Sequence, residues 1–396
     1  MVLPPWAIFQ TFHRRGAYFR MSSELGLSHR GRFDSIMRIL IVTTEYINLA
    51  SDNKRGSGIA RVVYEASEEM RKRGISVDIC SPEGPQISIS STGIPGRLGL
   101  ALFWQKALKK VRSIEWKYDI VWLHNPILLR RYAGKKTVIA TFHSTSMGKM
   151  NQPHSCSFKF YILMTSILEL ISNAKIEKSG FTVTCVSQNV LEELLNIGAN
   201  KKMVIRNGSQ FPLLTNPPVV DCILARSTCF LYVGRLDRIK NPRRIVQYYQ
   251  MVESLIENPS LVIVGDGPEY NGMLSENDDD SISFMGFVDH DRLLHFYDKA
   301  DFFIMASTYE GSPLTLMDAI NRGLRCIVPD IPSLRFIEEL HLGICYDRRD
   351  TDRAIEQIRN YVKGNLGKAK NCRVDFTWSS TIDKYTNLFE ESMNRE

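Results

Sequence analysis

The chain has 396 residues, of which 44% are hydrophobic and 23% are charged. This composition excludes wholesale disorder and supplies enough apolar material for two domain cores. The net charge of +7 is unevenly divided: residues 1–210 hold 29 Lys and Arg against 15 Asp and Glu, whereas residues 211–396 hold 21 against 28. A basic half joined to an acidic half predicts two domains with different partners.

The eight cysteines are scattered singly, and no two of them form a CxxC pair. This spacing indicates neither a zinc site nor a disulfide framework, and it predicts reduced thiols in a cytoplasmic protein. No run reaches the roughly 18–20 apolar residues of a membrane span. The closest stretch, residues 158–174, is interrupted by Lys159 and Glu169 and is typical of a buried or interfacial helix.

Residues 1–36 are rich in Arg and aromatic side chains and lack the long apolar core of a signal peptide. Met37 then opens the apolar run MRILIV, as the start of a domain would. We therefore expect residues 1–36 to be a poorly ordered N-terminal extension, or the product of an upstream start codon.

From Met37 onward, short β-branched runs alternate with helical stretches. The first run, residues 38–43, precedes a glycine-containing loop, and the helical stretch that follows, residues 59–74, ends on a glycine as a C-cap would. Strands that alternate with helices predict parallel βαβ units. The further predicted strands of this series are residues 76–81, 118–124, 136–142 and 182–187.

Residues 211–226 interrupt this pattern, because they contain three prolines and no helical period. The sequence therefore predicts an α/β protein in which residues 211–226 link two Rossmann-like domains, residues 37–210 and residues 227–375. Ligands of such sheets bind beyond the carboxyl ends of the strands, so functional residues are expected in the loops that follow them. The predicted strands of the second series are residues 229–233, 260–264, 282–285, 300–305 and 325–329.

Two cations follow the first strand of the second series, in the loop GRLDRIKNP. Arg235 and Lys240 can converge on a diphosphate, since a guanidinium forms forked hydrogen bonds and an ammonium acts as a point charge. Taken alone this loop is weak evidence, because basic loop residues are usually only solvated.

Residues 309–323 form the strongest signature. A predicted helix begins near Leu314, and the loop before it brings Gly311 and Ser312 to a helix N-terminus, where free N–H groups and the helix dipole favour a phosphate. Glu310 and Asp318 lie eight positions apart and are suited to accept hydrogen bonds from the hydroxyls of a hexose and a ribose. The alternative is a capping acid and an exposed helical aspartate.

In this order, the segments GRLDRIK, VIVGDGPE, FMGFVDHDRLLHFYDKADFFIMAS and YEGSPLTLMDA resemble the nucleotide-binding half of retaining family-four glycosyltransferases. The resemblance extends from Met37 to about Glu391. It implies a GT-B fold, in which two Rossmann-like domains with parallel sheets face a central cleft. It also implies that residues 376–396 form a C-terminal helix that crosses back to the first domain, with Trp378 at the crossing.

The resemblance assigns roles to individual residues. Arg235 and Lys240 would bind the donor diphosphate, Glu310 the transferred sugar, and Asp318 the ribose, although the family usually has a glutamate at that position. His143, in the T-x-H strand end, would contact the donor sugar or orient the acceptor, whereas the H-x-P strand end at His124 is structural or lines the acceptor cleft. The remaining implied donor-binding residues are Gly56, Gly58, Phe287, Val288, Gly311, Ser312, Pro313 and Leu314.

The implied activity is transfer of a sugar from a nucleoside-diphosphate sugar to a hydroxyl acceptor with retention of anomeric configuration. The resemblance implies no cofactor and no metal site, and residues 278–280 are interpreted as a solvated loop. The alternatives are a hydrolase or epimerase of the same fold and a catalytically silent scaffold. No known nucleic-acid motif is present, so we expect no nucleic-acid partner.

Residues 98–112 place Leu, Phe and Trp beside four cations, a pattern of interfacial helices. They suggest a lipid-linked acceptor and a peripheral enzyme on the anionic cytoplasmic face of a membrane. The alternative is an ordinary amphipathic helix packed on its own domain.

Overall fold

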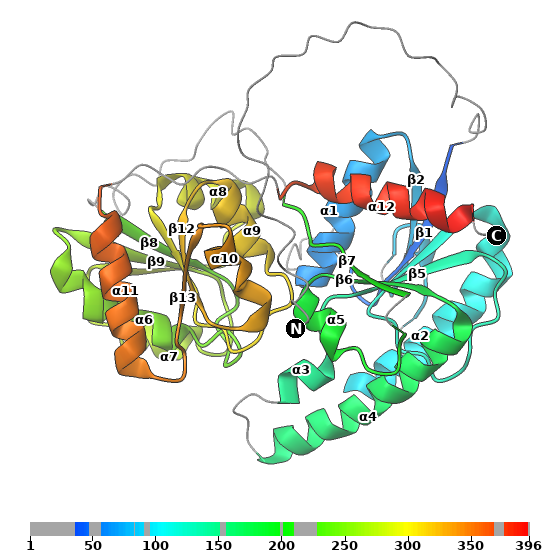
Figure 1. Cartoon of the computed structure of the whole chain (residues 1–396), viewed down its shortest axis with the longest axis horizontal. Helices are drawn as coiled ribbons and strands as arrows, with labels where there is room; N and C mark the ends of the chain where they lie inside the picture. Colours follow the sequence, from blue (N-terminus) through cyan, green and yellow to red (C-terminus); the bar gives the residue numbers. More distant parts are fainter. Residues whose placement is uncertain are drawn as a thin grey trace, which may run out of the picture. The chain divides into compact units, whose positions relative to one another are not determined.

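The structure is a computed structural model that describes residues 36–46, 57–82, 84–90, 96–150, 156–198, 201–209, 228–367 and 376–394. Residues 1–35 of the predicted extension, the whole predicted linker and Gly56 lie outside these ranges. The described residues build two parallel sheets covered by helices, as the α/β prediction requires (Figure 1).

The first sheet contains seven described strands in the order β3-β2-β1-β4-β5-β6-β7, and every pair of neighbours is parallel. Its inner strands are almost entirely buried, which explains why they are continuous apolar runs rather than alternating ones. Their bounds are β1 Arg38–Val42, β2 Ser76–Ser81, β3 Ile87–Ser88, β4 Ile120–His124, β5 Thr137–Phe142, β6 Thr182–Cys185 and β7 Lys202–Val204.

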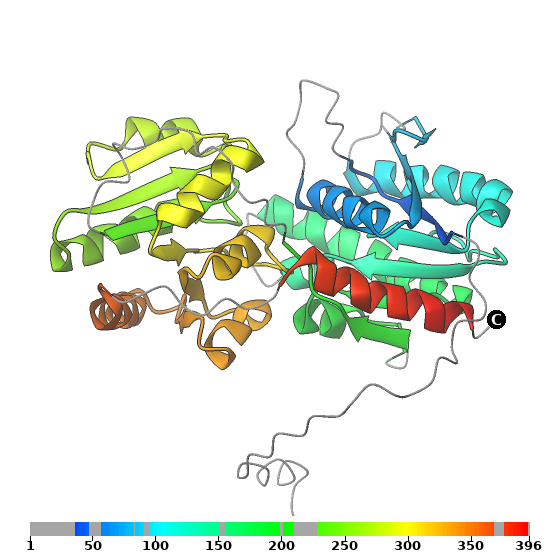
Figure 2. The ribbon, with the colours of Figure 1, turned by 90° about the horizontal axis from the view of Figure 1, so that it is seen from above.

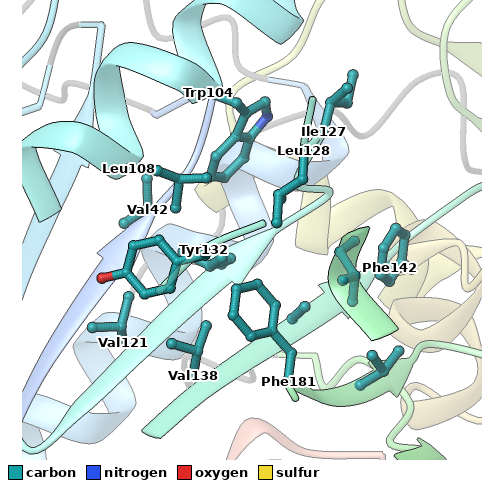
Figure 3. Packing of buried hydrophobic residues seen from close by; sticks show 14 of the residues in the cluster. Val42, Trp104, Leu108, Val121, Ile127, Leu128, Tyr132, Val138, Phe142 and Phe181 are labelled. Atoms are coloured by element: carbon teal, nitrogen blue, oxygen red, sulfur yellow. The ribbon is translucent and has the colours of Figure 1, made fainter. Parts of the chain in front are cut away.

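Helices cover both faces of this sheet, so that each face has a core of its own (Figures 1 and 2). Figure 3 shows the core on the face that α2 covers, where Trp104 and Leu108 lie with Val42 and Val121. The helices of this region are α1 Gly58–Lys72, α2 Gly96–Ile114, α3 Ser146–Met150, α4 Cys156–Ser179 and α5 Gln188–Glu193.

Helix α2 contains residues 98–112, whose sequence suggests an interfacial helix. Phe103 and Trp104 are buried in the core of the domain, and Ala107 and Val111 are fully buried as well. The aromatic side chains of α2 therefore stabilise the domain and are not accessible to a membrane. The alternative, an amphipathic helix packed on its own domain, accounts for these buried residues, whereas Leu98 and Leu100 are exposed.

The second sheet contains six described strands in the order β10-β9-β8-β11-β12-β13, again all parallel. One core packs against α8, α9 and α10, and the other against α6 and α11. The strands are β8 Thr228–Val233, β9 Pro259–Val264, β10 Ile282–Gly286, β11 Phe302–Ile304, β12 Arg325–Pro329 and β13 Gly343–Tyr346. The helices are α6 Pro242–Val252, α7 Tyr270–Ser275, α8 His290–Lys299, α9 Leu314–Asn321, α10 Phe336–Glu339 and α11 Thr351–Asn365.

Helix α12, Trp378–Met393, follows the second sheet in sequence but packs against the first one, beside α1 (Figure 1). Thr377 caps the helix by accepting a hydrogen bond from the N–H of Ser380. Trp378 is 2% exposed, and its indole N–H donates to Glu65 of α1 at 2.5 Å. The helix is thus fixed by an apolar face and by a buried polar contact near its first turn.

Replacing Trp378 should therefore destabilise the protein. Trp378→Ala removes a buried indole and leaves the carboxylate of Glu65 without its donor, so we expect the free energy of unfolding to fall by about 3–5 kcal/mol. Trp116→Ala is the matched control, because Trp116 is 69% exposed and its removal should cost less than about 0.5 kcal/mol. Urea unfolding followed by circular dichroism measures both, and equal effects would contradict the packing described for α12.

Candidate active site

The order of the strands reverses between β1 and β4 in the first sheet and between β8 and β11 in the second. In open parallel sheets, ligands bind beyond the carboxyl ends of the strands at such switch points. Most of the predicted site residues follow strands that lie at or next to these points, whereas Phe287 and Val288 follow the edge strand β10. The side-chain contacts below bring several of them together.

The loop after β8 holds the two predicted diphosphate cations. Asp237 accepts hydrogen bonds from the N–H groups of Ile239 and Lys240, at 3.0 and 3.1 Å, which tightens the turn. The Arg235 side chain is 72% exposed, and its Nε lies 3.3 Å from a carboxylate oxygen of Asp237. The exposed Arg235 side chain can therefore turn toward a ligand, whereas the backbone of Lys240 is held by the turn.

Lys240 Nζ donates to Oε1 of Glu310 at 2.6 Å, although the two residues are 70 positions apart. Glu310 is 6% exposed, and the N–H of Thr308 donates to the carbonyl of Ile239 at 2.7 Å, which joins the two loops. The structure therefore places a cation and an acid in contact at the ends of neighbouring strands. An ammonium in this position can serve both the acid and a bound phosphate, because it has three donors.

The residues before α9 lie against the first domain. A Cβ at Gly311 would collide with the carbonyl oxygen of His143, so only glycine fits at this contact. Asn207 donates to the carbonyl of Ser312 at 3.1 Å and fixes the next residue. The helix then begins at Leu314, after Pro313. The N–H groups of Leu314 and Thr315 have no partner within the helix, as a phosphate-binding helix end requires, whereas that of Leu316 donates to the carbonyl of Pro313.

Asp318 is buried, with 1% of its surface exposed, so the alternative of an exposed helical aspartate is wrong. Arg61 of α1 binds its two carboxylate oxygens at 2.9 and 3.2 Å, and Ser209 donates to it at 2.5 Å. Burial alone would lower the pKa of Arg61, but the carboxylates of Asp318 and Glu65 raise it. The predicted contact of Asp318 with a ribose would require at least one of these bonds to be exchanged.

His143 lies beside His124, with Nε2 of His143 2.9 Å from Nδ1 of His124. Burial lowers the pKa of His143 to about 4, so its ring is neutral near pH 7. The backbone N–H of His143 donates to the side chain of Asn125 at 2.8 Å. His143 can thus offer Nδ1 to a ligand as a neutral hydrogen-bonding group whose orientation His124 sets.

The other predicted donor-binding residues are more scattered. Gly58 is the first residue of α1, and a Cβ built on it would meet open space. Phe287, which follows β10, is 45% exposed, whereas Val288 packs against one core of the second sheet. The loop 278–280 precedes β10, where Asp279 accepts from both polar groups of Ser281.

Several residues that contribute to this region were not identified from the sequence. For Arg61 the sequence offers one indication. A cation in the first turn of a helix is unfavourable for the helix dipole, so its presence there suggests a partner outside the helix. The sequence offers no such indication for Glu193 and Ser209, because Tyr309 and Asp318, which bind them, come from the other domain. Glu193 accepts from the hydroxyl of Tyr309 at 2.8 Å, and Tyr309 accepts from the N–H of Thr145 at 3.2 Å.

Groups that could hold a metal ion, helices that could cross a membrane and disulfides are all absent among the described residues. Within these ranges, no group of three or more His, Cys, Asp or Glu side chains is arranged to hold a metal ion. No described helix combines the length and apolarity needed to cross a bilayer. The cysteines whose side chains are described are buried and form no disulfide with one another, namely Cys80, Cys185, Cys229, Cys326 and Cys345.

Comparisons with known proteins agree with this geometry. Residues 56–209 match the family described as Glycosyltransferase Family 4, and residues 225–374 match the one described as Glycosyl transferases group 1. An Escherichia coli UDP-Gal:alpha-D-GlcNAc-diphosphoundecaprenol alpha-1,3-galactosyltransferase is 25% identical over 371 residues, which cover 84% of this chain and 93% of that protein. A Mycobacterium tuberculosis glycogen synthase is 24% identical over 307 residues, 72% of this chain and 70% of that enzyme.

Solved structures resemble the chain in fold. Sucrose-phosphate synthase from Thermosynechococcus elongatus superimposes with a TM-score of 0.66 at 19% identity, over 91% of this chain and 100% of that one. WaaG, a glycosyltransferase involved in lipopolysaccharide biosynthesis, gives a TM-score of 0.62 at 14% identity, over 90% and 98%. These likenesses confirm the predicted GT-B arrangement of two Rossmann-like domains, and the two family matches together span most of the chain. The chain therefore belongs to glycosyltransferase family 4.

Proposed function

We propose that the chain transfers a sugar from a nucleoside-diphosphate sugar to a hydroxyl acceptor, with retention of anomeric configuration. The contact between Lys240 and Glu310, at 2.6 Å, carries this proposal. It joins a cation suited to a diphosphate with an acid suited to sugar hydroxyls, and the N-terminus of α9 lies a few residues away. A nucleotide sugar presents these two chemistries side by side.

In the proposed reaction, the bond between the anomeric carbon and the diphosphate breaks, and a bond to the acceptor oxygen forms on the same face. The departing phosphate oxygen takes the proton of the acceptor hydroxyl. Arg235, Lys240 and the N–H groups at the start of α9 stabilise the negative charge on the leaving group, and neutral His143 hydrogen-bonds the sugar. These groups, rather than a metal ion, carry the charge compensation, so activity should persist in excess chelator.

The first experiment is a thermal-shift screen of nucleotide sugars, because a ligand that binds only the folded state raises the melting temperature. With the best donor, Lys240→Ala and Glu310→Ala should each lower turnover about 100-fold or more, since each removes a group aimed at the donor. Release of nucleoside diphosphate, measured with and without candidate acceptors, reports this loss.

Lys299→Ala is the matched control, because Lys299 is an exposed residue at the end of α8 and should retain normal turnover. Near-normal turnover in both site variants would sink the site assignment. Equal release of nucleoside diphosphate with and without acceptors would favour a hydrolase, and no turnover of any stabilising donor would favour a silent scaffold.

A separate prediction concerns Asp318. If its carboxylate exchanges Arg61 for the donor ribose, Asp318→Asn should weaken binding of a nucleoside diphosphate about tenfold but leave its 2′,3′-dideoxy analogue almost unaffected, because the analogue lacks the hydroxyls. If Asp318 serves only Arg61 and Ser209, both ligands should weaken equally. Calorimetric titration of the two ligands into wild type and variant separates these roles.

The acceptor is proposed to be lipid-linked, so that the enzyme works at a membrane surface. The similar Escherichia coli galactosyltransferase is named for a diphosphoundecaprenol acceptor. Support from the chain itself comes from α4, where no exposed position between residues 161 and 174 is charged. Its exposed side chains, each between 45% and 51% exposed, are Tyr161, Leu163, Met164, Ile167 and Ile171.

This face of α4, rather than α2, should therefore mediate membrane binding. Met164→Glu should lower the partition of the protein onto anionic liposomes at least fivefold, because the charge opposes insertion among acyl chains. Met251→Glu on α6 is the matched control, since both methionines are 51% exposed. Co-sedimentation measures the partition, and an equal response of the two variants would contradict a role for α4.

A further inference from the structure

A separate cavity lies beside Glu310. Its volume is about 440 Å³, which falls within the range of small-molecule sites. Its wall includes Glu310 but not Arg235, Lys240 or Gly58. The cavity is therefore distinct from the cations of the proposed donor site, yet it shares with that site the acid expected to contact the transferred sugar.

The wall of this cavity comes from both domains and from the functional end of each sheet. Its residues follow five strands at their carboxyl ends, which is where parallel sheets bind ligands. Met147 follows β5, Glu193 follows β6, Tyr309 follows β11, Ser333 follows β12, and Arg348 follows β13.

The inner wall is tightly built. Tyr309 donates to Glu193 at 2.8 Å, and Thr145 donates to the same carboxylate. A Cβ at Gly148 would collide with the Glu193 carboxylate and with the Tyr309 ring, so a larger residue there would displace these side chains. These contacts join the two domains along one side of the cavity, and they give a ligand a preformed surface.

The charged side chains on the wall differ in whether they have hydrogen-bond partners. Each of the three acids already accepts a hydrogen bond from a side chain: Glu310 from Lys240, Glu193 from Tyr309, and Glu192 from Gln188 at 3.0 Å. By contrast, the guanidinium groups of Arg348 and Arg349 have no hydrogen-bond or ion-pair partner within the described part of the chain. Arg348 and Arg349 are therefore the groups on this wall that an anion can bind.

We propose that the cavity receives the acceptor, and that Arg348 and Arg349 bind a phosphate or diphosphate group carried by that acceptor. Two adjacent guanidinium groups can form forked hydrogen bonds with phosphate oxygens. The shared wall at Glu310 would then bring an acceptor hydroxyl toward the donor sugar. This inference rests on the proposed transferase function and adds the chemical class of the acceptor.

The anion can belong to a lipid diphosphate or to a soluble sugar phosphate, and two probes distinguish these sources. We would saturate the protein with the nucleoside diphosphate found in the donor screen, which occupies Arg235 and Lys240. Decyl diphosphate and glucose 1-phosphate are then titrated calorimetrically, with methyl α-glucoside as the neutral match. Binding of decyl diphosphate alone indicates a lipid-linked acceptor, and binding of glucose 1-phosphate indicates a soluble or sugar-phosphate acceptor.

The double variant Arg348→Gln/Arg349→Gln should weaken binding of the charged probe at least tenfold, because it removes the charged hydrogen bonds to the phosphate, and tenfold corresponds to 1.4 kcal/mol. Its affinity for nucleoside diphosphate should change by less than about twofold. Arg359→Gln is the control, because Arg359 is an exposed arginine of the following helix, α11.

The proposal is overturned if neither charged probe binds saturably, if methyl α-glucoside binds as tightly as glucose 1-phosphate and decyl diphosphate does not bind, or if the double variant keeps wild-type affinity. Failure of the proposed transferase function would give a different result, because no nucleotide sugar would then raise the melting temperature of the protein. In that case the same titration on the free protein still tests whether the arginines bind phosphate.

Discussion

The candidate site depends on one geometric constraint, namely that the carboxyl ends of parallel strands meet at the same edge of a sheet. β8 and β11 are paired neighbours, with Phe302 opposite Phe230. The loops that follow them therefore start side by side, which lets Lys240 reach Glu310 across 70 positions of sequence. The cavity wall obeys the same constraint with loops from both sheets. The contact between Lys240 and Glu310 thus follows from the pairing of β8 with β11.

A second interaction sets how the two domains meet. Arg61, near the start of α1, binds Asp318 of α9 with both of its terminal nitrogens, and also binds Glu65 at 2.6 Å. A buried ion pair of this type is weak evidence for stability, because desolvation offsets much of the attraction. It does impose a direction and a distance. The pair holds the N-terminal half of α1 beside α9. The start of α1, with the implied donor-binding residue Gly58, and the start of α9 therefore belong to one connected unit.

The sequence predicted the fold, and it identified Lys240 and Glu310, which the structure brings into contact, because both predictions depend on short segments of the chain. Buried parallel strands appear as apolar runs, and the loop before α9 carries its glycine and acid in sequence. It could not predict partners contributed by the other domain. Glu193, Ser209 and the arginines at 348 and 349 look like ordinary surface residues until the fold brings them to the cleft. The apolar aromatic residues of α2 were ambiguous for the same reason, since periodicity does not say which side a helix buries.

The departure at Asp318 can now be explained by packing. A glutamate would add a methylene at a position that is 1% exposed and already has Ser209 at 2.5 Å. The longer side chain would have to displace Ser209 or Arg61, or turn toward the cleft, because close-packed interiors do not absorb an extra methylene freely. The shorter acid thus fits the positions of Arg61 and Ser209, and the three side chains form one hydrogen-bonded group. Any contact of this position with a donor ribose must compete with that arrangement, which makes donor binding and the meeting of α1 with α9 coupled events.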